Sequence, residues 1–244
     1  MRRDGADAVR DAEGFRQYTG VSRETTTRLT AYAALLRRWQ RRINLVGPKT
    51  LPDLWRRHML DSAQLLPLLP ESASRVVDLG SGGGFPGLVL AALGRDRTPP
   101  LDTVHLVEAD QRKAAFLREA ARVMTLSDKV QVAAQRIEAL PPIAADVVTA
   151  RALAPVDLLL NHVQRLCGAG TPCVFLKGRR LKDELTEAKS AWYIEYRIAP
   201  SCTDSEGAIL LIDDFAPRES VPGTSEEDGA HVRSDPRLDD PAEG

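Results

Sequence analysis

The apolar residues in the first third of the chain recur at helical spacing. Steps of three and four residues separate Leu29, Tyr32, Leu36, Trp39 and Ile43, which is the pattern of an amphipathic helix. Ser22 supplies a suitable N-cap ahead of it. The spacing predicts a helix over 23–42, ended by Gly47 and Pro48, and a second helix over 51–66 that prolines 67 and 70 stop.

From Arg75 onward, short apolar runs rich in β-branched residues alternate with helical stretches. The expected strands are 75–79, 103–108, 129–133, 146–150, 173–177, 193–199 and 208–212. The expected helices are 87–94, 111–124 and 155–167, with a short turn near 136–140. This alternation predicts a doubly wound α/β fold with a mostly parallel seven-stranded sheet. Only about eight residues separate the last two strands, so we expect them to form an antiparallel pair.

Four segments follow from these patterns. Residues 1–20 are polar and are expected to be flexible, and 21–70 form a helical N-terminal extension. Residues 71–215 form the α/β domain. Residues 216–244 are rich in Pro, Gly, Ser and acidic residues. Because such a segment buries little apolar surface, we expect a disordered acidic tail.

Composition favours an ordinary soluble protein, with 43% hydrophobic and 27% charged residues. No apolar run approaches the roughly 20 residues of a membrane span, and the first residues lack the apolar core of a signal peptide. We therefore expect a cytoplasmic protein without a membrane partner, and a monomer. Three cysteines and four histidines show no zinc-ligand spacing, so no metal is predicted.

Charge is distributed unevenly along the chain. Residues 216–244 carry eight acidic and three basic residues, so their net charge of −5 leaves +4 for the rest of a chain whose total is −1. Seven basic residues and a single acid, Asp53, lie between residues 37 and 57: Arg37, Arg38, Arg41, Arg42, Lys49, Arg56 and Arg57. This block suits RNA phosphates, although a solvated helix face would also explain it.

A glycine-rich turn follows the first expected strand. Gly82, Gly84 and Gly87 match the G-x-G-x-x-G pattern of dinucleotide binders, whereas Asp78, Gly80 and Gly82 match the acid-x-Gly-x-Gly pattern of methyl-donor enzymes. The turn lies at the carboxyl ends of the strands, where ligands bind in such sheets. A carboxylate at position 78 can reach a cationic ligand group but would repel a pyrophosphate. A helix N-cap is the simpler role for Asp78.

Glu108 ends the second expected strand, 28 residues after Gly80. An acid at this place can accept hydrogen bonds from both hydroxyls of a ribose. Binders of NAD and of S-adenosylmethionine share this feature, so it indicates a nucleoside without choosing between them.

Several short motifs, taken with their order and spacing along the chain, can be compared with those of known families. They lie at residues 44–46, 58–62, 78–87, 113–118, 136–138, 150–152 and 176–178. Over about residues 23–215 this series resembles the bacterial 16S rRNA guanine-N7 methyltransferase family (RsmG, also called glucose-inhibited division protein B). The resemblance implies a Rossmann-like class I methyltransferase that uses S-adenosylmethionine and no metal. Its implied substrate is N7 of one guanine in the decoding-region loop of 16S rRNA, as free rRNA or in the small subunit.

The resemblance also implies roles for individual residues. By resemblance, the donor site maps onto Gly80, Phe85, Ile137, Glu138 and Arg151. The sequence pattern described above adds Asp78, Gly82 and Glu108 to this site. Family members often have Asp where this chain has Glu108, so either Glu108 or Asp110 is expected to bind the ribose. The candidate RNA contacts are Arg37, Arg38, Arg41, Arg42, Asn44, Arg57, His58 and Lys177.

Simpler roles stay open for some of these residues. Arg151 follows the fourth strand and can pair with the donor carboxylate or an RNA phosphate, or be a surface arginine. Lys177 ends the fifth strand and can meet a phosphate or solvent. His58 and Asp61 can frame the guanine, but a lone histidine on a short helix is often structural.

Guanine N7 carries an in-plane lone pair, so its methylation needs no prior deprotonation. We therefore assign no catalytic residue firmly, with His58 and Arg151 as candidates in a mechanism that depends on positioning. Three rivals remain: an NAD-dependent oxidoreductase, a methyltransferase for another RNA, a protein or a small molecule, and an RNA-binding module with a relic donor site. Three features argue against the oxidoreductase. They are Asp78, the C-terminal strand pair and the lack of a catalytic Tyr-x-x-x-Lys pair.

Overall fold

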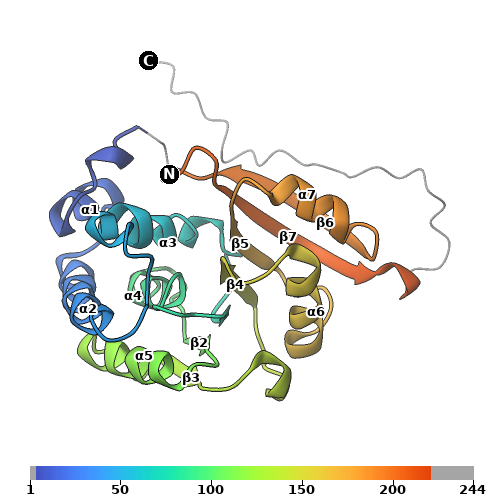
Figure 1. Ribbon diagram of the computed structural model, residues 1–244, viewed down its shortest axis with the longest axis horizontal. Helices are drawn as coiled ribbons and strands as arrows, with labels where there is room; N and C mark the ends of the chain where they lie inside the picture. Colours follow the sequence, from blue (N-terminus) through green and yellow to red (C-terminus); the bar gives the residue numbers. More distant parts are fainter. Residues whose placement is uncertain (1–3, 221–244) are drawn as a thin grey trace.

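In the computed structural model, which describes residues 4–220, helices cover both faces of a seven-stranded sheet (Figure 1). The strand order is β3-β2-β1-β4-β5-β7-β6. Strands β1 to β5 run parallel, and β7 runs antiparallel to both β5 and β6. The strands are β1 (Arg75–Leu79), β2 (Thr103–Val107), β3 (Val130–Ala133), β4 (Val147–Arg151), β5 (Cys173–Lys177), β6 (Trp192–Pro200) and β7 (Ala208–Pro217). The predicted fold class is confirmed.

The helices are α1 (Ala12–Thr19), α2 (Arg23–Gln40), α3 (Asp61–Ala63), α4 (Gly87–Leu93), α5 (Gln111–Val123), α6 (Val156–Cys167) and α7 (Leu181–Ala188). Short 3₁₀ turns lie at Ala6–Ala8, Leu51–Asp53, Leu66–Leu68, Ile137–Ala139 and Arg218–Ser220, and Trp55–Leu60 forms a π-helical turn. The expected helix over 51–66 is thus a series of short turns, of which α3 is one.

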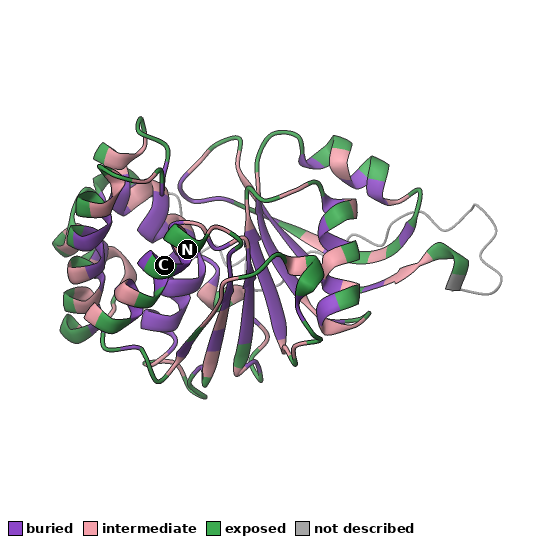
Figure 2. Ribbon diagram, turned by 60° about the horizontal axis from the view of Figure 1, so that its bottom comes forward, coloured by how far each residue is buried: buried purple, intermediate pink, exposed green. Residues whose placement is uncertain are grey.

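Alternate residues of the parallel strands point into two separate cores. Val76 of β1 packs in the core that the N-terminal helices, α4 and α5 cover. Its neighbour Val77 packs in the core beneath α6 and α7. Because both faces are covered, the central strands are buried almost throughout (Figure 2), as expected of a parallel sheet.

The N-terminal segment is more ordered than the sequence predicts. Residues 1–20 were expected to be flexible, yet α1 lies within them and is capped by Asp11, whose carboxylate accepts the N–H of Gly14 at 2.8 Å. Phe15 is fully buried against Trp55, with ring centroids 5.6 Å apart. Burial of Phe15, together with that of Ala6 and Val9, therefore orders a polar segment that is too short to show a clear helical period.

The C-terminal region also differs from the prediction. Helix α7 was not expected, and β7 continues five residues beyond the expected end at residue 212. Residues 216 and 217, assigned to the tail, pair with the start of β6, and buried Phe215 packs on Trp192. The predicted disorder of the remaining tail falls on residues 221–244, which lie outside the described part.

The register of the strands brings three sequence-predicted positions to one edge of the sheet. Leu79 of β1 aligns with Val107 of β2 and with Ala150 of β4. Gly80 and Glu108, which follow β1 and β2, and Arg151, the last residue of β4, therefore meet at the carboxyl edge, as expected for parallel strands.

Two further properties concern residues 4–220. None of their helices combines the length and apolar character that a bilayer crossing requires. Nor do these residues contain a cluster of three or more His, Cys, Asp or Glu side chains suited to a metal ion.

Candidate active site

Two cavities open at the carboxyl edge of the sheet, on either side of the glycine turn. The larger has a volume of about 740 Å³ and the smaller about 480 Å³, both within the range of small-molecule sites. Gly80, Gly82 and Leu153 belong to the walls of both. Two ligands held in these cavities would therefore meet over the glycine turn.

Bare backbone forms the floor between the cavities. Gly80 has a φ of +65°, a conformation that side chains other than glycine rarely adopt. A Cβ atom at Gly80 would lie 2.5 Å from Leu153 Cδ1. The backbone conformation therefore favours glycine here, whereas the exposed Leu153 side chain could move aside.

Asp78 lies behind the turn rather than in either cavity. Its side chain is fully buried and accepts hydrogen bonds from Thr149 Oγ1 at 2.9 Å and from the N–H of Gly87 at 3.3 Å. Burial raises the pKa of this carboxyl group to about 6, although its hydrogen bonds oppose the shift. Asp78 thus holds the start of α4 against β1, instead of facing the ligand as the sequence suggested.

Glu108 lines the smaller cavity and is tied to the glycine turn. One of its carboxylate oxygens accepts the N–H of Gly82, and the other accepts the N–H of Asp110, both at 2.8 Å. Asp110 instead caps α5, where it accepts the N–H groups of Arg112 and Lys113. Of the two acids, Glu108 is therefore the one placed to meet a ligand.

The 3₁₀ turn after β3 forms the opposite wall of the smaller cavity. Both of its predicted donor-site residues, Ile137 and Glu138, belong to this wall. Glu138 is exposed, and a backbone hydrogen bond and the nearby Arg136 lower the pKa of its carboxyl group. The structure thus brings Ile137, Glu138 and Glu108 together, as the sequence predicts.

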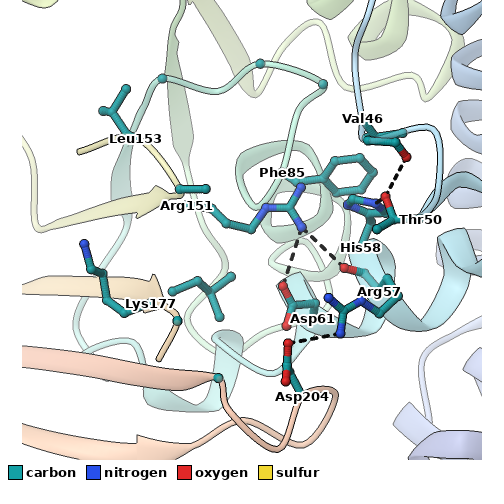
Figure 3. Close-up of a pocket in the computed structure, with 18 of the residues that line it drawn as sticks. Val46, Thr50, Arg57, His58, Asp61, Phe85, Arg151, Leu153, Lys177 and Asp204 are labelled. Carbon is teal, nitrogen blue, oxygen red and sulfur yellow. Dashed lines mark hydrogen bonds and ion pairs between the residues drawn. The ribbon is translucent and has the colours of Figure 1, made fainter. Parts of the chain in front are cut away.

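The larger cavity contains a stack of charged and aromatic side chains (Figure 3). The Arg151 guanidinium lies 4.9 Å from the centroid of the Phe85 ring and 3.5 Å from the Asp61 carboxylate. It also donates to the Arg57 carbonyl at 3.4 Å. Burial raises the pKa of Asp61, against the effect of Arg151. Arg151 is thus fixed within the cavity wall and is not a surface arginine.

His58 also packs on Phe85, with ring centroids 5.0 Å apart. Burial, with Arg151 and Arg57 nearby, lowers the pKa of His58 to about 3, so the ring is neutral near pH 7. Its Nε2 lies 2.8 Å from Thr50 Oγ1. Its Nδ1 is buried and has no hydrogen-bond partner in the described chain.

The predicted RNA contacts differ in their exposure and in the ion pairs and hydrogen bonds that they already form. Lys177 is nearly buried, pairs with Glu184 of α7, and donates to the Ala154 carbonyl at 2.9 Å. Arg57 pairs with Asp204, on the loop between β6 and β7, at 3.1 Å. Asn44 is exposed, and its amide oxygen lies 3.3 Å from Gln40 Nε2. Lys177 is therefore less available to a phosphate than its position at a strand end suggested.

The basic residues at the end of α2 remain exposed. Within residues 4–220 no ion pair engages Arg37, Arg38, Arg41 or Arg42. The same helix reaches the glycine turn through buried Tyr32, whose hydroxyl donates to the Gly83 carbonyl. Sequence reasoning missed this link, because Tyr32 reads only as one apolar position of an amphipathic helix.

Comparison with known proteins agrees with this geometry. The family model for rRNA small subunit methyltransferase G matches residues 25–209. A ribosomal RNA small subunit methyltransferase G of Parvibaculum lavamentivorans is 53% identical over 210 residues, which cover 85% of this chain and 91% of the relative. A protein of the same name from Paramagnetospirillum magneticum is 53% identical over 204 residues, 84% of this chain and 96% of its own length.

This chain belongs to the rRNA small subunit methyltransferase G family. It is a methyltransferase, and the family match does not favour the oxidoreductase alternative. Among solved structures, an O-methyltransferase from Bacillus cereus in complex with SAH superposes with a TM-score of 0.50 at 13% identity, covering 86% of this chain and all of that one. At that identity the likeness concerns the fold alone, which is the Rossmann-like fold of methyltransferases.

Proposed function

We propose that this protein transfers the methyl group of S-adenosylmethionine to N7 of a guanine in the decoding-region loop of 16S rRNA. The observation that carries the proposal is the pair of cavities that meet over Gly80 and Leu153, one lined by an acid at a strand end and the other by a neutral histidine. Relatives at about 50% identity bear the name of an rRNA methyltransferase, which supports RNA as the substrate.

The smaller cavity fits the nucleoside part of the donor. The Glu108 carboxylate can accept hydrogen bonds from ribose hydroxyls, and Ile137 offers an apolar surface to the adenine. The bare backbone of Gly80 lets the donor continue towards the larger cavity. There Arg151, which lies over the ring of Phe85, is the candidate partner for the donor's carboxylate.

The larger cavity fits the guanine, and His58 has the right protonation state to recognise it. The Thr50 hydroxyl donates its one hydrogen to the Gly47 carbonyl at 2.8 Å. With its hydrogen placed there, it accepts a hydrogen bond from His58, which corresponds to the tautomer with the proton on Nε2 and an acceptor at Nδ1 of the neutral ring. The orphaned Nδ1 is covered in the described chain, so a small movement of the His58 ring would let it accept from the N1–H or the N2 amino group of a guanine, which adenine does not offer in the same arrangement.

The chemistry requires little beyond positioning. When bound, S-adenosylmethionine supplies an electrophilic methyl group on a sulfonium centre. The lone pair of guanine N7 forms the new bond, and the electrons of the broken C–S bond stay on sulfur. Gly80 and Gly82 set the line of approach, and the rigid stack of Phe85, Arg151 and His58 holds the base. No residue has to remove a proton before the transfer.

The surrounding RNA would be held by the exposed arginines at the end of α2, Arg37, Arg38, Arg41 and Arg42, with Asn44 and Arg57 closer to the cavity. Free guanidinium groups suit phosphates. The base must leave its stack to enter the larger cavity. A substrate of this kind places the protein in the cytoplasm, with rRNA or the small ribosomal subunit as its partner.

Transfer of a tritiated methyl group separates the remaining alternatives. The purified protein and labelled donor would be incubated with small subunits, with free rRNA and with ribosome-depleted protein extract. We expect label only in the rRNA, and mass mapping of its nucleosides should find one 7-methylguanine. Label in protein, in a small molecule or at another base would contradict the proposed substrate.

A further inference from the structure

A groove lies outside the two cavities, between the end of α2 and the start of α5. Its volume is about 660 Å³, and its lining consists of Arg38, Trp39, Arg42, Ile43 and Arg112. In the sequence, Arg38 and Arg42 are candidate RNA contacts and Trp39 is only an apolar position of the helix. The structure gathers them with Arg112, a residue 70 positions further along the chain.

The groove is strongly cationic. Arg38 and Arg42 form no ion pair within the described chain. The nearest carboxylate oxygen to the Arg112 guanidinium is that of Asp110 at 3.8 Å, and 74% of the Arg112 side chain is exposed. A polyanion could therefore approach three guanidinium groups without displacing a strong internal partner.

Trp39 gives the groove a rigid aromatic wall. Its ring packs against buried Phe116, with centroids 5.7 Å apart and planes inclined by 60°. The tryptophan is only half-buried, and the part that Phe116 does not cover lines the groove. An aromatic surface flanked by arginines is the arrangement on which single-stranded bases stack while their phosphates are neutralised.

Residues that line the groove are sequence neighbours of residues that line the two cavities. Ile43 lies in its wall, and Leu45, two residues later, lies in the wall of the larger cavity. On α5, Arg112 lines the groove and the next residue, Lys113, lines the smaller cavity. The groove and the cavities are therefore lined by the same two segments of the chain, the one that follows α2 and the start of α5.

We propose that this groove holds an unpaired nucleotide next to the target guanine, with its base stacked on Trp39 and its phosphates held by Arg38, Arg42 and Arg112. The inference rests on the proposed function for the identity of the RNA. A duplex does not fit, because the faces of paired bases are covered by their neighbours. The occupant is a single-stranded segment of the substrate, held by stacking and charge rather than by the reading of its sequence.

Tryptophan fluorescence tests the groove independently of methyl transfer. Trp55 and Trp192 are only 5% and 4% exposed, so a stacked base should quench Trp39. We expect an oligoadenylate heptamer to quench the wild-type protein, and an abasic oligonucleotide of equal charge to leave the fluorescence unchanged. Trp39→Leu should abolish the quenching. The Arg38→Ala/Arg42→Ala variant should weaken binding about tenfold and flatten its salt dependence.

Methylation kinetics supply the second readout. For Trp39→Leu and for the double arginine variant we expect KM for the RNA to rise about tenfold, with kcat and donor affinity within twofold of wild type. Trp39→Phe should recover most of the loss. Arg23→Ala is the matched control, because it removes an exposed arginine at the other end of α2.

Wild-type KM values in these variants, or equal quenching by the abasic oligonucleotide, would overturn the inference. A failure of the proposed function looks different, since the wild-type protein would then methylate no RNA while the fluorescence titration still reports on the groove. Trp39→Leu could lower the melting temperature. Trp39→Phe and the double arginine variant would then still test the inference, because neither removes the aromatic packing on Phe116.

Discussion

The carboxylate of Glu108 accepts the backbone N–H of Gly82 at 2.8 Å. This bond joins the end of β2 to the glycine turn that follows β1, so the acid that faces the smaller cavity also sets the shape of its floor. Glu108 therefore carries two roles, one in the fold of the turn and one in the proposed recognition of the donor ribose.

Substitutions of Glu108 test whether its carboxylate contributes to the affinity for the donor. We expect Glu108→Ala to weaken binding of S-adenosylhomocysteine more than tenfold, because charged hydrogen bonds contribute about 1.5–3 kcal/mol each. Glu108→Asp should lie between this variant and wild type, since the shorter side chain cannot hold both N–H groups. Isothermal titration calorimetry measures the affinities.

Asp110→Ala is the control for Glu108. It removes the N-cap of α5 and should cost about 1 kcal/mol of folding stability, with less than a threefold change in affinity. The reverse result, with the larger loss of affinity in Asp110→Ala, would assign the ribose contact to Asp110.

The pair formed by Arg151 and Asp61 allows stability and activity to be tested apart. Arg151→Ala leaves the buried Asp61 carboxylate with hydrogen bonds from Thr203 and Gln64 but without its guanidinium partner, which should cost about 1–3 kcal/mol. We expect Asp61→Asn in the same chain to restore much of that stability in urea unfolding at pH 8. Methyl transfer should stay more than tenfold below wild type in the double variant, because the cation over Phe85 is still missing. Recovery of activity together with stability would show that Arg151 is purely structural.

Most of the fold could be predicted from the sequence because the local patterns of apolar residues agree with the strand pairing in the sheet. β-branched runs mark the buried parallel strands, and the helical period marks α2 and α5. Helix α1 escaped prediction because a single residue, Phe15, carries its burial. The end of β7 escaped because its pairing partner, the start of β6, lies about twenty residues away in the sequence and is not a local signal.

The site was predicted in part. A turn that follows a strand must lie at the carboxyl edge, so Gly80, Glu108 and Arg151 could be placed together from the sequence alone. Side-chain direction could not be read in the same way. Asp78 faces Thr149 on the neighbouring strand rather than the ligand, and Lys177 meets Glu184 of a helix that the sequence did not reveal.

Two conservative changes of His58 test its role as an acceptor. In Gln the amide occupies roughly the place of Nε2, so His58→Gln can keep the bond to Thr50 but offers nothing at Nδ1. In Asn the amide lies roughly at Nδ1, so His58→Asn can supply an acceptor there. We expect kcat/KM for rRNA to fall more than tenfold in His58→Gln and less in His58→Asn, with donor affinity unchanged in both. The opposite order would show that the bond to Thr50 is what matters.

The buried carboxyl group of Asp78 should leave a signature in the pH dependence of stability. Its pKa in the folded protein is about 6, above the ordinary value of 3.8, so the native state binds its proton more tightly than the unfolded state does. The cost of burying the charge is therefore fully present above about pH 6 and is relieved as the pH falls towards 4.

Asp78→Asn removes this titration and leaves the other groups in place. We expect the stability of wild type relative to Asp78→Asn to increase by roughly 2–3 kcal/mol between pH 7 and pH 4. Urea unfolding of both proteins across this range measures the difference. A constant difference, or one that shrinks as the pH falls, would mean that Asp78 keeps an ordinary pKa and that the turn is open to water at this point.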